Sequence, residues 1–134
     1  MIRHIQSGEG WRLGWNPTAE QFCGLVAGQY WSIELTAAEF ADFCRLAQQL
    51  KATMASMAEH LMDEERLTCD QETEQLWMEA DGFPHRFNLR FILLTGRRGE
   101  GEWPAECVDE LMAALSQPPF NAVAGDGGVG KATT

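Results

Sequence analysis

A chain of 134 residues with 45% hydrophobic side chains, five Trp and seven Phe can bury one hydrophobic core and is too short for two ordinary domains. Its formal net charge of −10 at pH 7 argues against tight nonspecific binding to nucleic acid or to an anionic membrane. No apolar run reaches the length of a membrane span, so no membrane association is expected.

The cysteines and the first residues indicate a reducing compartment. Cys23, Cys44, Cys69 and Cys107 occur without any C-x-x-C pair. The opening MIRHIQSGEG does not contain the apolar segment of a secretory signal. Both observations predict reduced thiols in the cytoplasm rather than a disulfide framework.

The first part of the chain predicts three short strands. Trp11, Leu13 and Trp15 alternate with Arg, Gly and Asn in WRLGWN, so they form one aromatic face of a strand. Two further strands are expected at 22–27 and 30–35, separated by a tight Gly-Gln connection.

A long amphipathic helix is predicted next, from about residue 36 to 62. Thr36 and Glu39 have the spacing of a capping box at its start. Apolar side chains recur along it in steps of three and four, which places them on one stripe of the helix. These are Phe40, Phe43, Ala47, Leu50, Met54, Met57 and Leu61.

The length of this helix suggests a homodimer. Some 26 helical residues span roughly 39 Å, whereas a strand of six or seven residues covers about 20–24 Å. The far end of the helix, with Met54, Met57 and Leu61, is therefore the candidate dimer face. The alternative is that the second helix and the loops of the same chain cover these residues.

The second part of the chain repeats the order of the first. Strands are expected at 66–70, 74–80 and 86–95, followed by a charged loop at 96–101 and a shorter helix at about 104–117. Alternation in the last strand places its Phe and Leu residues on one face and its arginines on the other.

Adjacent strands joined by short links imply antiparallel sheets, and hence an α+β fold of two β-β-β-α halves. A single domain is expected at 1–117, and the Gly- and Ala-rich segment 118–134 is predicted to be a disordered tail. Residues 125–131 have the G-x-x-x-x-G-K spacing of a phosphate loop. Because Ala132 replaces the hydroxyl residue and no helix can follow, this match predicts no nucleotide site.

Four segments together resemble a small uncharacterised family found in cyanobacteria, a domain of unknown function. They are GEGWRLGW, YWSIELTAAEFADFCRL, LMDEERL and LWMEADGFPHRFNLRFILLTGRRGEGEWP, and the resemblance covers about residues 3–117. It implies a fold similar to the Whirly type of single-stranded-DNA-binding transcriptional regulators. It implies no activity, and no functional residue carries over from it.

Among residues that could carry chemistry, the histidines are scattered. His4, His60 and His85 stand at a terminus, on a helix and in a turn, which predicts neither a metal site nor a catalytic triad. Glu34 and Glu79 lie inside strands, where each is either half of a carboxylate pair or, as favoured here, a solvent-facing or ion-paired residue. Arg12 and Arg90 are the expected ion-pair partners.

A cluster of basic residues is the candidate contact surface for nucleic acid or for a partner protein. It consists of Arg86, Arg90, Arg97 and Arg98. Alternation assigns Phe87 and Phe91 to the opposite, core-facing side, and Glu100 and Glu102 dilute the charge of the neighbouring loop.

The sequence therefore favours a non-enzymatic protein-interaction module of the cytoplasm, a homodimer with an unknown protein partner. A single-stranded nucleic-acid-binding protein is the alternative by fold analogy, although the charge disfavours it. An enzyme with a site of dispersed residues is the third class. No catalytic residue, metal ion or cofactor is predicted.

Overall fold

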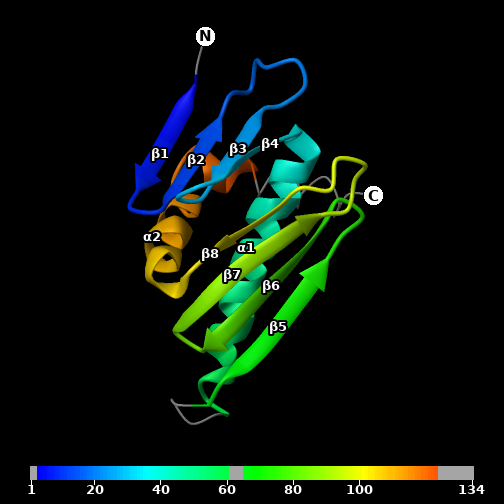
Figure 1. The fold of residues 1–134 in the computed structure, drawn as a ribbon. Helices are drawn as coiled ribbons and strands as arrows, with labels where there is room; N and C mark the ends of the chain where they lie inside the picture. Colours follow the sequence, from blue (N-terminus) through cyan, green and yellow to red (C-terminus); the bar gives the residue numbers. More distant parts are fainter. Residues whose placement is uncertain (1–2, 61–64, 124–134) are drawn as a thin grey trace.

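The protein, described here from a computed structural model, contains two four-stranded antiparallel sheets, one long helix and one shorter helix within residues 3–60 and 65–123, the part of the chain that the structure describes (Figure 1). The elements are β1 (His4–Gly8), β2 (Trp11–Trp15), β3 (Gly24–Ala27), β4 (Ser32–Leu35), α1 (Ala37–Met57), β5 (Leu67–Glu72), β6 (Leu76–Phe83), β7 (Arg86–Leu93), β8 (Glu100–Trp103) and α2 (Ala105–Leu115).

The first sheet has the strand order β1-β2-β3-β4, and each strand pairs with its neighbour in the sequence. Trp11 and Leu13 of β2 and Val26 of β3 are buried on the inner side of this sheet, as the alternation predicts. A Cβ atom on Gly24 would lie 2.5 Å from Cγ of Phe40, so glycine at this position allows α1 to pack closely against β3.

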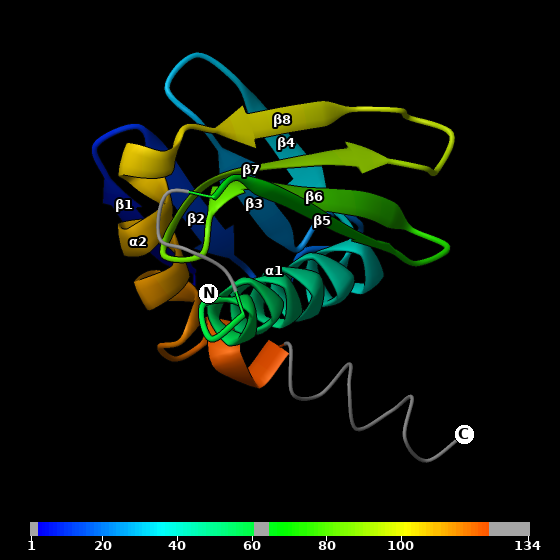
Figure 2. The same cartoon turned by 90° about the horizontal axis from the view of Figure 1, so that it is seen from below.

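The second sheet has the order β5-β6-β7-β8. Strands β6 and β7 are eight residues long, and every second side chain is buried. α1 packs mainly against β6 and β5, and α2 packs mainly against β7. Figure 2 shows α1 lying along one side of this sheet, whose other side no described helix covers.

One hydrophobic core joins the two sheets. Phe43 of α1 contacts Phe91 of β7 and Trp103 of β8, with ring centroids 5.5 and 5.7 Å apart. Trp103 Nε1 also donates a hydrogen bond to the carbonyl oxygen of Ala27 at 2.9 Å, which ties β8 to β3. The two sheets therefore share one cluster of buried side chains.

Several hydrogen bonds anchor the start of α1. The predicted capping box is confirmed, because Thr36 Oγ1 accepts from Glu39 N at 3.2 Å and Glu39 Oε1 accepts from Thr36 N at 2.9 Å. Glu39 is almost completely buried and also accepts from Thr95 Oγ1 at 2.9 Å and from the Arg97 guanidinium. These bonds connect α1 to the loop between β7 and β8.

The predicted α+β class with antiparallel sheets is confirmed, but each half contains four strands rather than three. β1 was missed because all five of its residues are exposed and give no hydrophobic alternation. β8 lies partly within the segment 96–101, which was predicted to be a loop. Residues 81–83, which follow the strand predicted at 74–80, belong to β6.

The prediction that the far end of α1 forms a dimer face is wrong for Met54. The helix ends at Met57 rather than at residue 62, and Met54 has no exposed surface within the chain, in which α1 packs mainly against β6 and β5. Met57 is half-buried, and Leu61 lies outside the described residues.

The disordered tail was predicted to begin at residue 118, which is too early. Residues 120–123 form a helical turn, Phe120 has no exposed surface and Val123 is buried. The ring of Phe120 packs edge-on against Phe40, with centroids 6.1 Å apart. The remainder of the tail, 124–134, including the phosphate-loop spacing, lies outside the described residues.

Candidate functional site

The outer side of the second sheet lies opposite α1 (Figure 1), and it carries polar side chains from all four strands. Strand alternation brings residues from all four strands to this side. They are Thr68, Asp70, Glu72, Trp77, Glu79, Asp81, Phe83, Arg86, Asn88, Arg90, Ile92, Glu100 and Glu102, and we call this surface the open face.

The central row of the open face surrounds one arginine with acids. Strand register places Asp70, Glu79, Arg90 and Glu102 side by side across β5, β6, β7 and β8. Arg90 Nε donates a hydrogen bond to Glu79 Oε1 at 2.9 Å. That bond, followed by the negative charges of Glu79, Glu102 and Glu100, raises the pKa of Arg90 above its ordinary value, so the guanidinium stays charged.

Trp77 links this row to the neighbouring one. The Arg90 guanidinium carbon lies 4.9 Å from the centroid of the Trp77 ring, within the range of a cation–π contact. Trp77 Nε1 donates to Asp70 Oδ2 at 2.8 Å. The half-exposed indole is thus held in a fixed orientation on an otherwise charged surface.

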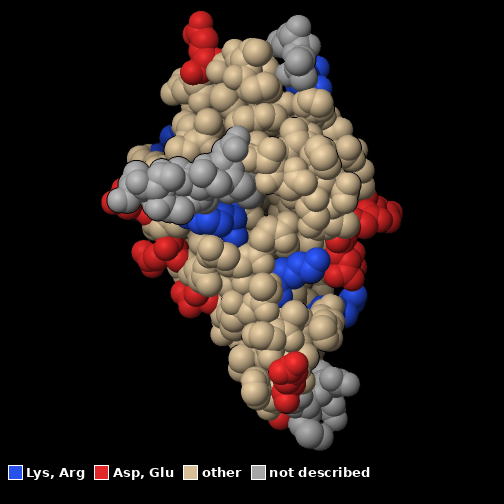
Figure 3. All heavy atoms as spheres, turned by 180° about the vertical axis from the view of Figure 1, so that it is seen from behind, with Lys and Arg blue, Asp and Glu red and all other residues tan. Residues whose placement is uncertain are grey.

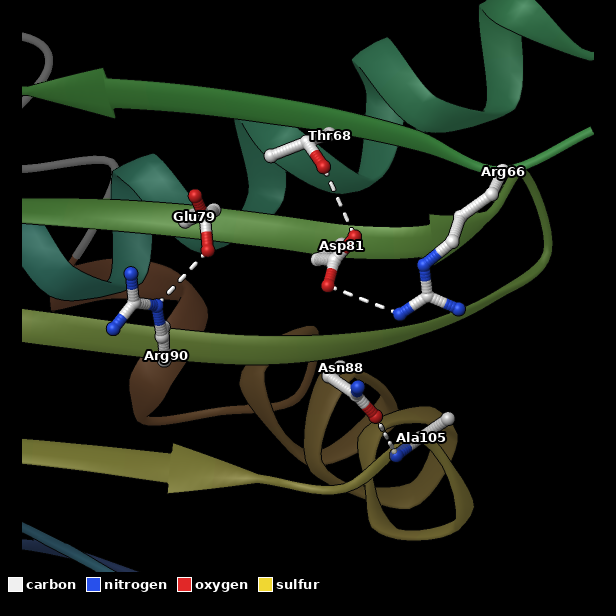
Figure 4. A network of polar contacts seen from close by, with 7 residues as sticks. All are labelled: Arg66, Thr68, Glu79, Asp81, Asn88, Arg90 and Ala105. Atoms are coloured by element: carbon white, nitrogen blue, oxygen red, sulfur yellow. Dashed lines mark hydrogen bonds and ion pairs between the residues drawn. The ribbon is translucent and has the colours of Figure 1, made fainter.

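Asp81 accepts the hydrogen bonds of the next row of the open face (Figure 4). Its carboxylate accepts from Arg66 Nη2 at 3.0 Å and from Thr68 Oγ1 at 2.9 Å. The hydrogen bond from Arg66, and then that from Thr68, lower the pKa of Asp81 below its ordinary value. Arg66 also lies over the Phe83 ring, with its guanidinium carbon 5.8 Å from the ring centroid.

Asn88 connects the open face to α2. Pro104 precedes this helix and provides no side-chain cap. Asn88 Oδ1 instead accepts from the backbone N–H of Ala105 at 2.8 Å, which satisfies one of the unpaired donors at the helix start (Figure 4). This residue is therefore a structural one.

Two shallow clefts open on and beside this surface. One, of about 230 Å³, is lined by Glu79, Asp81, Asn88, Arg90 and Glu102. The other, of about 360 Å³, lies at the edge of β8 and is lined by Trp31, Arg90, Phe91, Glu100, Gly101 and Glu102. They share Arg90 and Glu102, so they form one continuous polar surface.

The open face is acidic overall. It contains six carboxylates, and it holds two arginines with a third, Arg66, at its margin. Within residues 3–60 and 65–123, no group of three or more His, Cys, Asp or Glu side chains could hold a metal ion. The reverse side of the molecule is different, because most of its described surface is uncharged (Figure 3).

The structure does not bring the four predicted arginines together. Arg86 and Arg90 lie on the open face, whereas Arg97 contacts Glu39 and donates to the carbonyl oxygen of Glu34 at 2.7 Å. The Arg97 guanidinium also lies 4.8 Å from the centroid of the Phe22 ring. Arg98 occupies a turn with a φ of 55°. A continuous basic patch is therefore not formed by these residues.

Other sequence predictions have mixed outcomes. The favoured interpretation of Glu79 as the ion-pair partner of Arg90 is confirmed. Glu34 is exposed and does not form a carboxylate pair with Glu79, which lies on the other sheet. The four cysteines are free thiols, and burial raises the pKa of Cys44.

Sequence reasoning missed Trp77 and Asp81 as members of one surface. The signal was available in LWMEADGF, where alternation places Trp77, Glu79, Asp81 and Phe83 on the same side of one strand. The expected end of this strand at residue 80 removed Asp81 from the pattern.

No helix among the described residues is both long and apolar enough to cross a membrane.

Comparisons with known proteins agree with this fold. Residues 6–117 match the model of DUF1818, a domain of unknown function. The crystal structure of a protein of unknown function from the DUF155 family, from Prochlorococcus sp. NATL2A, is similar with a TM-score of 0.80 and 26% sequence identity, and the match covers 85% of this chain and 96% of that one. No curated protein shows a significant match. The chain belongs to the DUF1818 family of domains of unknown function.

Proposed function

We propose that the protein is a non-enzymatic protein-interaction module of the cytoplasm whose open face binds a basic segment of a partner protein. The observation that supports this most is the central row, in which three carboxylates flank one arginine on a sheet surface that no described helix covers. The four free cysteines support the cytoplasmic location.

The ion pairs of the open face contribute little to folding. The Arg90 and Glu79 side chains are 45% and 20% exposed, and exposed pairs of this kind stabilise a protein by about 0–1 kcal/mol. Their ordered arrangement is therefore better explained by recognition than by stability. A surface with excess carboxylates and a fixed indole suits lysine and arginine side chains, which form ion pairs and cation–π contacts.

A matched pair of charge-reversal variants tests the proposal. The double variant Glu100→Lys/Glu102→Lys reverses charge on the open face, and Glu20→Lys/Glu59→Lys makes the same change at exposed positions elsewhere. Each protein is used as bait in cell extract, and bound proteins are identified by mass spectrometry. A specific partner should be lost with the first variant and retained with the second.

Direct titration with an oligolysine peptide completes this test. The first variant should bind the peptide at least about tenfold more weakly than the wild type, because two carboxylates become cations in the same cleft. Equal weakening by the control variant would show that overall charge, rather than the open face, governs binding. That result would overturn the proposal.

Single-stranded nucleic-acid binding is the second candidate. We propose a Whirly-like fold and a cyanobacterial origin from the resemblance of the sequence, and both support this candidate. The Trp77 ring beside Arg90 supports it as well, since bases stack on such pairs. The engagement of Arg90 with Glu79 and of Arg97 with Glu39 weighs against it. An electrophoretic shift with single-stranded DNA at low and at moderate salt separates the two functions.

The proposal includes a homodimer. Its interface requires a surface other than Met54, which is buried within the chain. A second copy would present two open faces, so a partner with two basic segments would bind more tightly than one with a single segment.

A further inference from the structure

We infer that β1 pairs in antiparallel orientation with β1 of a second copy, so that the two first sheets join into one sheet. This inference rests on the homodimer of the proposed function and supplies its interface. It does not involve the open face, which lies on the other sheet.

β1 is an unprotected edge strand. It ends the first sheet and pairs with β2 alone among the described strands, and all five of its residues are exposed. An edge strand leaves backbone N–H and C=O groups available for another strand unless proline, lysine or a bulge blocks it. The sequence HIQSG contains no proline or lysine, and its register with β2 is continuous.

The charges that flank β1 are self-complementary. We place the two-fold axis at Gln6, so that Gln6 of one copy faces Gln6 of the other. A residue that precedes Gln6 by a given number of positions then faces the residue that follows Gln6 by the same number in the other copy. Arg3 of one copy then faces Glu9 of the other, and Ile5 faces Ser7 of the other. Each dimer contains this Arg–Glu pair twice, and opposite charges that face each other across strands are favourable.

The outer surface of the first sheet adds an apolar contribution. Ile5 is 48% exposed and lies against Gly14, where a Cβ atom would be 3.0 Å from Ile5 Cδ1. Together with Leu25 these residues line a shallow cleft of about 190 Å³. The proposed pairing places the Ile5 side chains of the two copies near each other, so their exposed apolar surfaces would meet at the seam.

The other sheet edges are less suitable for self-association. β5 carries Asp70 and Glu72, and a second copy of that strand would bring like charges together. β4 and β8 contact each other, and Trp31 Nε1 donates to the carbonyl oxygen of Glu102 at 3.3 Å. Because the protein has a net charge of −10, a second copy is repelled least at the edge formed by β1, whose residues include no Asp or Glu.

A charge exchange tests the register. Sedimentation equilibrium should show a wild-type dimer, and Arg3→Glu should raise the dissociation constant about tenfold or more, because two Arg–Glu pairs become repulsive. The double variant Arg3→Glu/Glu9→Arg should restore the wild-type value. Arg86→Glu, a matched charge change at an exposed position on the other sheet, should have no such effect.

A cross-linking experiment tests the axis independently. Gln6→Cys should form a disulfide-linked dimer on mild oxidation, because the two Gln6 residues face each other. His4→Cys, on the same side of the same strand, should not, since it faces Gly8 of the other copy. The wild type, with its four native cysteines, controls for other cross-links.

The possible results distinguish an error in the β1 interface from an error in the proposed homodimer. A monomeric wild type would overturn both this inference and the homodimer of the proposed function. A dimer that Arg3→Glu leaves unchanged, or that Gln6→Cys does not cross-link, would overturn the β1 interface alone. Circular dichroism confirms that each variant is folded.

Discussion

Glu39 is a buried residue that connects the two halves of the protein. Its carboxylate is buried, and it bonds at once to the backbone of Thr36, the hydroxyl of Thr95 and the guanidinium of Arg97. The sequence predicted the bond to Thr36, because a capping box has a fixed spacing of three residues. It could not predict the other two, which join positions more than 50 residues apart and arise where the start of α1 meets the loop between β7 and β8.

Replacing Glu39 by Gln should lower the free energy of unfolding by about 2 kcal/mol or more. The amide keeps the size of the side chain but removes the negative charge that Arg97 contacts inside the protein. Urea denaturation measures the change, with Glu59→Gln as the control at an exposed position in the turn after α1. Equal stability of Glu39→Gln and the wild type would contradict the role assigned to this carboxylate.

Asp81 gives the protein a pH-dependent contribution to stability. Its pKa lies below the ordinary value of 3.8 in the folded state, mainly because Arg66 and Thr68 donate hydrogen bonds to it. Its stabilising contribution is therefore present above the unfolded pKa and is lost as the pH falls through the folded pKa.

We expect Asp81→Asn to be less stable than the wild type at neutral pH and equally stable once the pH is below the folded pKa of Asp81. Urea denaturation over a pH series measures the difference, which should be small because the Asp81 and Arg66 side chains are 35% and 56% exposed. Asp109→Asn, at an exposed position on α2, is the control. A difference that persists unchanged into acid would show that the carboxylate charge is not the cause.

At the scale of elements, the sequence identified those with a strong hydrophobic period and missed those without one. α1, β6 and β7 bury alternate or periodic apolar residues, so their patterns were readable. β1 buries none, and β8 buries Trp103 as its single fully enclosed side chain. These edge strands form because a neighbouring strand offers hydrogen bonds, which is a property of the sheet rather than of their own residues.

The same limit applies to the candidate site. Alternation within each strand predicted that Arg86 and Arg90 share a face away from Phe87 and Phe91, and the structure agrees. It could not predict which acids stand beside Arg90, because strand register determines this and depends on pairing across the sheet.

The helical turn at 120–123, which follows α2, contributes to the core, although the composition of this segment predicts a disordered tail. Truncation after residue 123 should leave the melting temperature close to that of the full chain, since the described core is then complete. Truncation after residue 118 removes Phe120 and should lower the free energy of unfolding by roughly 3 kcal/mol or more, as expected for loss of a buried phenylalanine. Phe120→Ala should reproduce most of that loss in the full-length protein, and thermal unfolding would measure all three.

At the scale of the whole molecule, the repetition of sheet and helix in the sequence suggests two similar halves, but the packing makes them interdependent. α1 follows the first sheet in the chain, yet it packs mainly on the second. α2 follows the second sheet and contacts β7 together with β1 and β2 of the first. Each sheet therefore relies on a helix that also contacts the other sheet, which predicts that the domain unfolds cooperatively.

Cys44 provides a test of that cooperativity. It lies on α1 with no exposed surface, and burial raises the pKa of its thiol, so it should react with a thiol reagent only when the core opens. In a variant with Cys23, Cys69 and Cys107 changed to Ser, the free energy derived from the rate of Cys44 labelling should equal that from urea denaturation. Labelling much faster than global unfolding would mean that α1 separates from the sheets while part of the protein remains folded. The shared core, in which Phe43 contacts both Phe91 and Trp103, predicts instead that α1 and the two sheets are lost together.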